Sequence, residues 1–139
     1  MILARECGLD LELADIPVQS LVPAALRATA SIEEYMTELP KYDAEMSAQT
    51  AAAAAKGMKL RYVGVVDVKA RSGAVELREY PADHPFAQLS GSDNIISFQT
   101  KRYSDQALVI RGPGAGAEVT AGGVFGDVLR ICQYLGALS

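Results

Sequence analysis

The sequence predicts an α+β fold, in which a mixed or antiparallel sheet of two hairpins is packed with helices and followed by a C-terminal helix. Helical spacing and capping signals dominate the first 57 residues. Alternation of apolar and polar residues replaces them between residues 60 and 112, and a glycine-rich stretch then leads into an amphipathic segment. A chain of 139 residues is long enough to build one real core.

The bulk composition is that of an ordinary globular protein, with 50% apolar and 22% charged residues. The formal net charge is −4 and the isoelectric point is near 5.0, which argues against nucleic acid or an anionic membrane as a partner. No run of 18 apolar residues predicts a transmembrane helix, and "MILARECGLD" lacks the pattern of a signal peptide.

The first residues, "MILAREC", are typical of the last two turns of a helix that stops at Gly8. Because a domain rarely starts within a helix, we expect the chain to be the C-terminal piece of a longer protein. The following segment, "LDLELADIPVQSLVP", alternates leucine with acidic residues and predicts a strand that ends at Pro17.

Two helices are predicted next. "SIEEYMTELP" begins with a capping box, in which Ser31 caps the amide three residues on and Glu34 reaches back to the Ser31 amide. Pro40 ends this helix. The alanine-rich stretch that starts at "KYDAEM" predicts the second helix, with Gly57 as its C-terminal cap.

Two hairpins follow the helices. Residues 60–68 and 74–81 flank a turn that contains Gly73, and residues 94–103 and 106–112 flank the dipeptide "SD". The second hairpin is the more apolar of the two. It is expected to be either part of the core or an interface between two copies of the chain.

The last element predicts a helix over about residues 117–135. Gly122 and Gly126 lie four residues apart on one face, where they would let another backbone or a flat ligand approach closely. A neighbouring face carries an apolar stripe of Val124, Val128, Ile131 and Leu135.

The segment "GPGAG" before this helix has three possible roles. A phosphate cradle is disfavoured, because the spacing is not G-x-G-x-x-G, Pro113 lacks an amide donor and Glu118 places a carboxylate where a phosphate would bind. Close approach to a neutral ring, or to another backbone, fits the segment better. The third possibility is a simple glycine hinge before a closely packed helix.

The residues that usually carry metal or nucleophilic chemistry are few. Cys7 and Cys132 lie far apart, and His84 cannot complete a metal site with them, so we expect two free thiols and no metal. His84, in "ADHPF", is predicted to lie in a loop.

Several motifs resemble the homoserine dehydrogenase family. The string "LVIRGPGAGAEVTAGGVFGDVLR" is similar to that family's C-terminal signature, and "ILARECG", "LRYVGVVD" and "HPFAQLSGSDNIISFQTKRY" resemble it as well. The similarity is greatest to the dehydrogenase half of bifunctional aspartokinase–homoserine dehydrogenases of plants and algae. It covers essentially the whole chain.

The resemblance implies a reaction and a cofactor. Enzymes of this family reduce L-aspartate 4-semialdehyde to L-homoserine with NADH or NADPH, on the route to threonine and methionine. Residues 1–116 would then be the C-terminal part of the substrate and dimerisation domain, and residues 117–139 the helix that returns to a Rossmann-type domain absent from this sequence. By resemblance, Gly116 lies beside the nicotinamide, and Gly114 and Thr120 complete the candidate cofactor-binding residues.

The resemblance also implies what the chain does not carry. The family's nucleotide fingerprint, substrate carboxylates and catalytic lysines are expected upstream of Met1, so no residue here is assigned a catalytic role and the isolated chain is expected to be inactive. A homodimer, and a location in the plastid stroma or the cytoplasm, are expected. Surface positions are predicted for Lys41, Lys56, Lys59, Lys69 and Lys101.

Two other functions remain open from the sequence. The chain could be a dimerising α+β module without catalysis, or a regulatory domain that binds an amino acid. The second alternative is the weaker one, because such domains usually repeat a β-α-β unit and no internal repeat is present.

Overall fold

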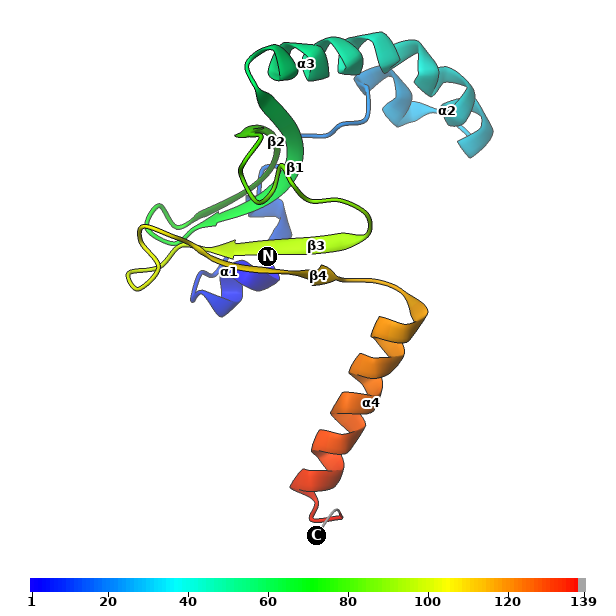
Figure 1. Cartoon of the computed structure of the whole chain (residues 1–139). Helices are drawn as coiled ribbons and strands as arrows, with labels where there is room; N and C mark the ends of the chain where they lie inside the picture. Colours follow the sequence, from blue (N-terminus) through cyan, green and yellow to red (C-terminus); the bar gives the residue numbers. More distant parts are fainter. Residues whose placement is uncertain (138–139) are drawn as a thin grey trace. The chain divides into compact units, whose positions relative to one another are not determined.

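A computed structural model describes residues 1–137 and divides the chain into two compact units, Met1–Ala87 and Gln88–Ser139 (Figure 1). Helices and two separate two-stranded antiparallel sheets make up the architecture, and each unit contains one of the sheets. The α+β class predicted from the sequence is therefore confirmed. The predicted functional boundary at residue 116 concerns a longer enzyme and stays a prediction.

The predicted N-terminal helix is present as α1 (Ile2–Glu6). Gly8 follows it with φ of 78° and donates its amide to Arg5 O at 2.9 Å, while Leu9 N donates to Ala4 O at 2.9 Å. These two bonds form a Schellman motif, which satisfies carbonyls that the helix end leaves open. Ala4 and Leu9 are both buried, so the motif anchors the start of the chain in the first unit.

The prediction of a strand that ends at Pro17 is wrong. A short 3-10 helix, η1 (Leu13–Asp15), replaces it, and the Glu12 amide donates to the Asp15 carboxylate at 2.9 Å. This local bond competes with strand pairing, and it leaves Leu13 69% exposed. A single parallel bridge forms further on, between Val18 and Val75.

The two predicted helices are α2 (Ile32–Glu38) and α3 (Asp43–Ala55). Ser31 Oγ accepts the Glu34 amide at 3.1 Å, as predicted, but the Glu34 carboxylate accepts the Ala30 amide instead of the Ser31 amide.

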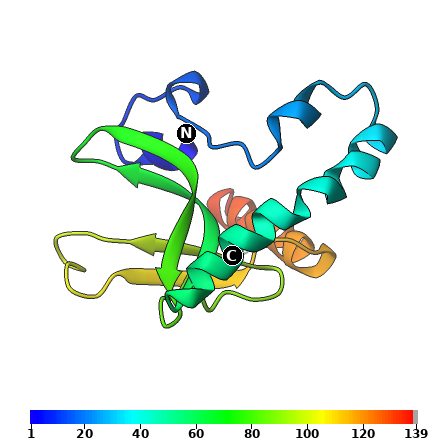
Figure 2. The ribbon, with the colours of Figure 1, turned by 90° about the horizontal axis from the view of Figure 1, so that it is seen from above.

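Two 3-10 helices flank α2. They are η2 (Ala24–Ala28) before it and η3 (Leu39–Tyr42), with Pro40 in its first turn, after it. Because η3 runs directly into α3, α2, η3 and α3 form one continuous, bent helical segment in Figure 2. Gly57, with φ of 71°, follows the end of α3, as predicted.

The first hairpin pairs β1 (Met58–Asp67) with β2 (Ser72–Pro81). It is longer than predicted. The turn does not contain Gly73 as predicted, because Gly73 lies within β2; Arg71, with φ of 52°, is the left-handed residue of the turn.

Gln19 fixes the preceding segment to this hairpin. Its amide donates to Val75 O at 2.8 Å, its side-chain oxygen accepts the Leu77 amide at 2.9 Å, and its carbonyl accepts the Tyr62 hydroxyl at 2.8 Å.

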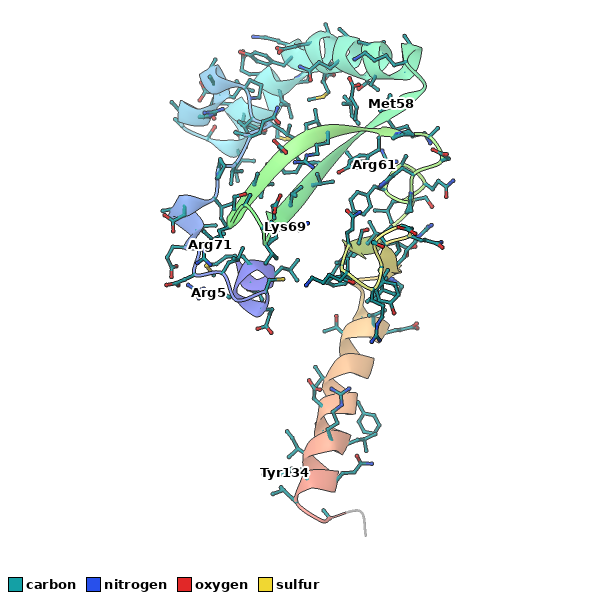
Figure 3. All side chains as sticks on the ribbon, turned by 90° about the vertical axis from the view of Figure 1, so that its left-hand side faces the viewer. Arg5, Met58, Arg61, Lys69, Arg71 and Tyr134 are labelled. Carbon is teal, nitrogen blue, oxygen red and sulfur yellow. The ribbon has the colours of Figure 1, made fainter. Side chains whose placement is uncertain are left out.

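The segment after β2 is held against β1 by Arg61, which Figure 3 labels. The Arg61 guanidinium donates to Phe86 O and Ala87 O, each at 2.8 Å, and to Leu60 O at 3.0 Å. His84 lies in this turn, as predicted, and its Nδ1 accepts the Phe86 amide at 3.1 Å. Rings of Tyr80, His84 and Phe86 pack on one another with centroids 4.6–5.2 Å apart.

The core of the first unit is small. Within residues 1–137, the buried apolar side chains all belong to this unit, and none is larger than leucine or isoleucine: Ala4, Leu9, Ile16, Leu26, Ala53 and Ala87.

The second unit contains β3 (Asp93–Phe98), β4 (Leu108–Pro113) and α4 (Ala117–Tyr134). The predicted turn at "SD" is wrong, because a loop over residues 99–107 separates the strands. Bonds within that loop replace the ladder: the Thr100 hydroxyl accepts the Tyr103 amide at 3.2 Å, and Gln99 Nε2 donates to Ser104 O at 3.2 Å.

The C-terminal helix α4 is confirmed, and it ends in a second Schellman motif. Gly136, with φ of 73°, donates to Gln133 O at 3.1 Å, and Ala137 N donates to Cys132 O at 2.9 Å. The helix therefore has a defined end at Leu135.

Candidate functional site: the glycine loop and the start of α4

The three predicted cofactor-binding residues lie where β4 passes into α4. Gly116 is the N-cap of α4 and has φ of 132° and ψ of 152°, a conformation that only glycine adopts without strain. Its carbonyl accepts the Thr120 amide at 3.0 Å, which is the first bond of the helix. The structure thus brings Gly116 and Thr120 together across one turn.

These two residues share a shallow, largely apolar hollow on one side of α4, which is open to solvent and lined by this helix and its N-cap alone. A Cβ built on Gly116 would meet no atom within 4 Å, so the loop backbone itself forms this end of the hollow. The lining residues are Gly116, Ala117, Thr120, Ala121, Val124, Phe125 and Val128. Small side chains therefore lie near the loop and larger ones lie further along the helix. Such a surface fits a flat, neutral group better than a phosphate.

The charge at the helix start supports the same conclusion. The first four amides of an α-helix lack partners within it and carry partial positive charge. Here Glu118 places a carboxylate in the first turn, and no side chain caps the helix. The carboxylate offsets that positive end, so an anion is disfavoured at this position.

Gly114 does not line the hollow. A Cβ built on Gly114 would lie 1.8 Å from Asn94 Nδ2, which means that the Asn94 side chain packs directly on the Gly114 backbone. Sequence reasoning missed Asn94, because its link to the loop depends on the hairpin register. In the register of β3 and β4, Asn94 pairs with Gly112, so a correct prediction of this register would have placed Asn94 next to the glycine loop.

Most of α4 is open to solvent, and no residue in Ala117–Tyr134 is buried. The predicted apolar stripe is exposed, with Val124 61%, Val128 47%, Ile131 59% and Leu135 72% accessible. A Cβ on Gly122 or Gly126 would meet nothing within 4 Å. The contact that would require these glycines is therefore not made by the described part of this chain.

Within residues 1–137, the lysine, cysteine and acidic side chains outside this hollow do not gather into a second candidate site. Lys41, Lys56, Lys59, Lys69 and Lys101 are all exposed, as predicted. Both Cys7 and Cys132 are free thiols. Within residues 1–137, no cluster of His, Cys, Asp and Glu could hold a metal ion, and no helix is long and apolar enough to cross a membrane.

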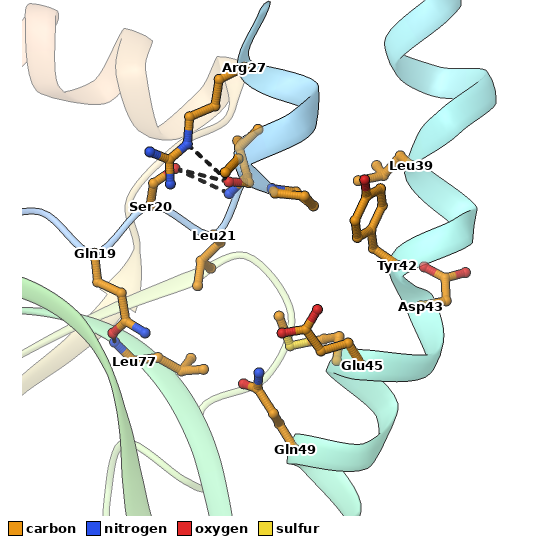
Figure 4. Close-up of a pocket in the computed structure, with 14 residues that line it drawn as sticks. Gln19, Ser20, Leu21, Arg27, Leu39, Tyr42, Asp43, Glu45, Gln49 and Leu77 are labelled. Carbon is orange, nitrogen blue, oxygen red and sulfur yellow. Dashed lines mark hydrogen bonds between the residues drawn. The ribbon is translucent and has the colours of Figure 1, made fainter.

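A cavity of about 480 Å³ lies in the first unit, between α3 and residues 19–27 (Figure 4). Leu21, Leu39 and Met46 supply apolar lining, and Glu45 and Gln49 project from α3. The polar groups opposite α3 are already engaged. Arg27 Nε donates to Val22 O at 3.3 Å, and Gln19 accepts from Leu77.

Comparisons with known proteins identify the class to which this arrangement belongs. The family model for homoserine dehydrogenase matches residues 1–129. A crystal structure of a Candida auris protein of unknown function covers 95% of this chain with a TM-score of 0.87 and 45% sequence identity. The chain belongs to the homoserine dehydrogenase family.

The relatives also show how much of a longer protein this chain matches. The chloroplastic bifunctional aspartokinase/homoserine dehydrogenase 1 of Zea mays is 64% identical over 139 residues, which is the whole of this chain and 15% of the maize protein. The homoserine dehydrogenase of Schizosaccharomyces pombe is 44% identical over 137 residues, or 36% of that protein. The chain thus spans between about a seventh and about a third of these relatives.

Proposed function

We propose that this chain forms one wall of the cofactor site in an NAD(P)-dependent homoserine dehydrogenase, which reduces L-aspartate 4-semialdehyde to L-homoserine. The observation that carries the proposal is the hollow in which Gly116 and Thr120 meet the apolar start of α4. In the maize and Schizosaccharomyces pombe relatives, the matching segment is part of a protein that is named a homoserine dehydrogenase. The remaining regions of the enzyme would come from sequence outside these 139 residues.

The residues present fit a nicotinamide ring. Gly116 has open space where a side chain would stand, and Gly114 and Thr120 flank it in sequence. When bound, the reduced nicotinamide would supply a hydride to the aldehyde carbon, and a proton from a general acid or from water would complete the alcohol. Gly116 would leave room for the ring, Thr120 would line the hollow one turn along, and Val124 with Phe125 would exclude water from it.

The exposed face of α4 supports an interface with a nucleotide-binding domain. Gly122 and Gly126 cost helix stability of about 1 kcal/mol each relative to alanine, and the described residues provide no contact that offsets this cost. A second backbone packed on these glycines would supply it. Catalytic lysines and substrate carboxylates would belong to that other part of the enzyme.

A homodimer through the second hairpin is part of the proposal. Ile96, Leu108, Val109 and Ile110 of the hairpin are 37–56% exposed. A second copy could bury these strands in a shared sandwich. Sedimentation equilibrium tests this point, and a monomer at micromolar concentration would refute it. The plant relatives are named chloroplastic, which favours the plastid over the cytoplasm.

The proposed function is tested in a hybrid enzyme, in which residues 1–139 replace the matching segment of the maize protein. NADPH oxidation with L-aspartate 4-semialdehyde should then remain within about tenfold of the maize enzyme. The isolated chain should give no turnover. A hybrid that folds, as judged by circular dichroism, and still gives no turnover would contradict the proposal.

A matched pair of variants makes the hybrid test specific to the cofactor wall. Gly116→Val should abolish NADPH turnover, since valine is strained at φ of 132° and adds bulk at a residue that lines the hollow. Gly112→Ala, in the same segment, adds a Cβ that meets nothing within 4 Å and should leave turnover unchanged. If both variants changed NADPH turnover equally, Gly116 would have no specific role in cofactor binding.

The cavity of the first unit supports a second candidate function, binding of a small amino acid. Its apolar lining and the Glu45 carboxylate suit an aliphatic ammonium compound. Calorimetry of the chain with threonine, homoserine and NADPH separates the two candidates. Threonine binding that is lost in Glu45→Gln and kept in Glu33→Gln, on the neighbouring helix α2, would favour the regulatory function.

A further inference from the structure

Among the described glycines, Gly114 is the one at which an added Cβ would come closest to a side chain, that of Asn94. A Cβ on Gly114 would lie 1.8 Å from Asn94 Nδ2, 2.5 Å from its Cγ and 3.3 Å from its Cβ. The three nearest atoms thus all belong to one residue. Gly114 is also absent from the residues with positive φ, so its backbone would accept an L-residue. Within residues 1–137, the Asn94 side chain is therefore the first obstacle that a side chain at this position would meet.

The hairpin register explains how Asn94 reaches the loop. Asn94 pairs with Gly112, and side chains two residues apart on a strand point to the same face. Gly112 and Gly114 therefore place no side chain on that face of the chain. The Asn94 carboxamide packs on the exposed backbone at Gly114. On the opposite face, Arg111 and Asp93 form an ion pair at 2.8 Å.

The same contact lies at the end of the ladder. The last rung joins Asp93 to Pro113, and no main-chain hydrogen bond of Gly114 or Ala115 is found among the described residues. Only Ala115 separates Gly114 from Gly116, the residue whose backbone forms the end of the hollow. The packing of Asn94 on Gly114 is therefore the restraint nearest to the start of α4.

We propose that Asn94 is a positioning residue for the cofactor wall. Its carboxamide packs on Gly114 and thereby fixes the path of the loop that places Gly116 beside the nicotinamide. This inference rests on the proposed function. It predicts an effect on cofactor affinity and not on the chemical step, because Asn94 acts through the position of Gly116.

The first test is a double-mutant cycle in the maize hybrid described above. Asn94→Ala removes the carboxamide, and Gly114→Ala forces it out of place. Each single variant should raise KM for NADPH about tenfold while kcat and KM for the semialdehyde change less than about twofold. In the double variant the new methyl group occupies the vacated position, so KM for NADPH should return to within about threefold of the parent.

Gly112→Ala serves as the matched control, because its Cβ meets nothing within 4 Å and its φ is not positive. Its kinetic constants should equal those of the parent. Additive effects in the double variant, an unchanged KM in Asn94→Ala, or a fall in kcat alone would overturn the proposal. These outcomes are read against an active hybrid, so they are distinct from failure of the proposed function.

A second measurement tests the contact in the 139-residue chain itself, without any activity. Amide resonances of Ala115, Gly116 and Ala117 should shift in Asn94→Ala and in Gly114→Ala, but not in Gly112→Ala. If the hybrid is inactive, this measurement still decides whether Asn94 positions the loop. Unchanged resonances in Asn94→Ala would overturn the inference.

Discussion

The two units of this chain differ in how their apolar residues are used. The first unit buries Leu9, Ile16 and Leu26, and Gln19 and Arg61 tie separate segments to its hairpin. In the second unit no described residue is buried, and α4 carries an exposed apolar stripe. Burial of apolar surface is the main source of protein stability, so we expect the second unit to depend on a partner more than the first unit does.

The largest expected difference between the units is in hydrogen exchange. Amides of α4 in the isolated chain should exchange at least about 100-fold faster than those of the β1–β2 ladder, because a helix without tertiary packing is only marginally stable. The measurement is exchange followed by NMR at micromolar concentration. Equal protection of both elements in a monomer would show that α4 needs no partner.

The second comparison is the cost of truncating an apolar side chain. Leu26→Ala should lower the free energy of unfolding by about 2–4 kcal/mol, because Leu26 is 5% exposed. Val124→Ala on α4 should change it by less than about 0.5 kcal/mol, because Val124 is 61% exposed. Urea denaturation measures both values, and similar costs would remove the contrast between the units.

Arginine provides the third comparison. Arg61→Ala removes donors from three main-chain carbonyls in the first unit and should cost about 1.5–3 kcal/mol. Arg111→Ala removes an ion pair with Asp93, in which both side chains are partly exposed, and should cost about 0.5 kcal/mol or less. Arg61→Lys, which cannot reach several carbonyls at once, should resemble the alanine variant in thermal unfolding.

The sequence predicted those elements whose signals are local. Capping at Ser31, the glycine that ends α1 and the periodicity of α4 all act within a few residues, and each was found as expected. The predicted strand before Pro17 failed because alternation alone cannot show that Glu12 and Asp15 bond locally. The predicted second turn failed for a similar reason, since side chains of Gln99 and Thr100 close a longer loop.

The candidate site was predictable only in part. A motif resemblance led to Gly114, Gly116 and Thr120, and the structure places Gly116 and Thr120 on one hollow. Asn94 lies 20 residues before Gly114 in the sequence and reaches it through the strand register, which no local pattern encodes. The cofactor roles of the three predicted residues stay a prediction until the hybrid enzyme is assayed.

The last comparison concerns the glycines of α4, where the sign of the expected effect differs between the isolated chain and the longer enzyme. Gly122→Ala should stabilise the helix in the isolated chain by about 0.5–1 kcal/mol, because alanine has the higher helix propensity and its Cβ meets nothing within 4 Å. In the hybrid enzyme the same methyl group would separate α4 from the domain that it packs on, and NADPH turnover should fall. Circular dichroism and the NADPH assay measure the two effects, and Ala121→Gly provides the reverse control in the isolated chain. A variant that gains helix content and keeps full activity would show that no backbone approaches Gly122.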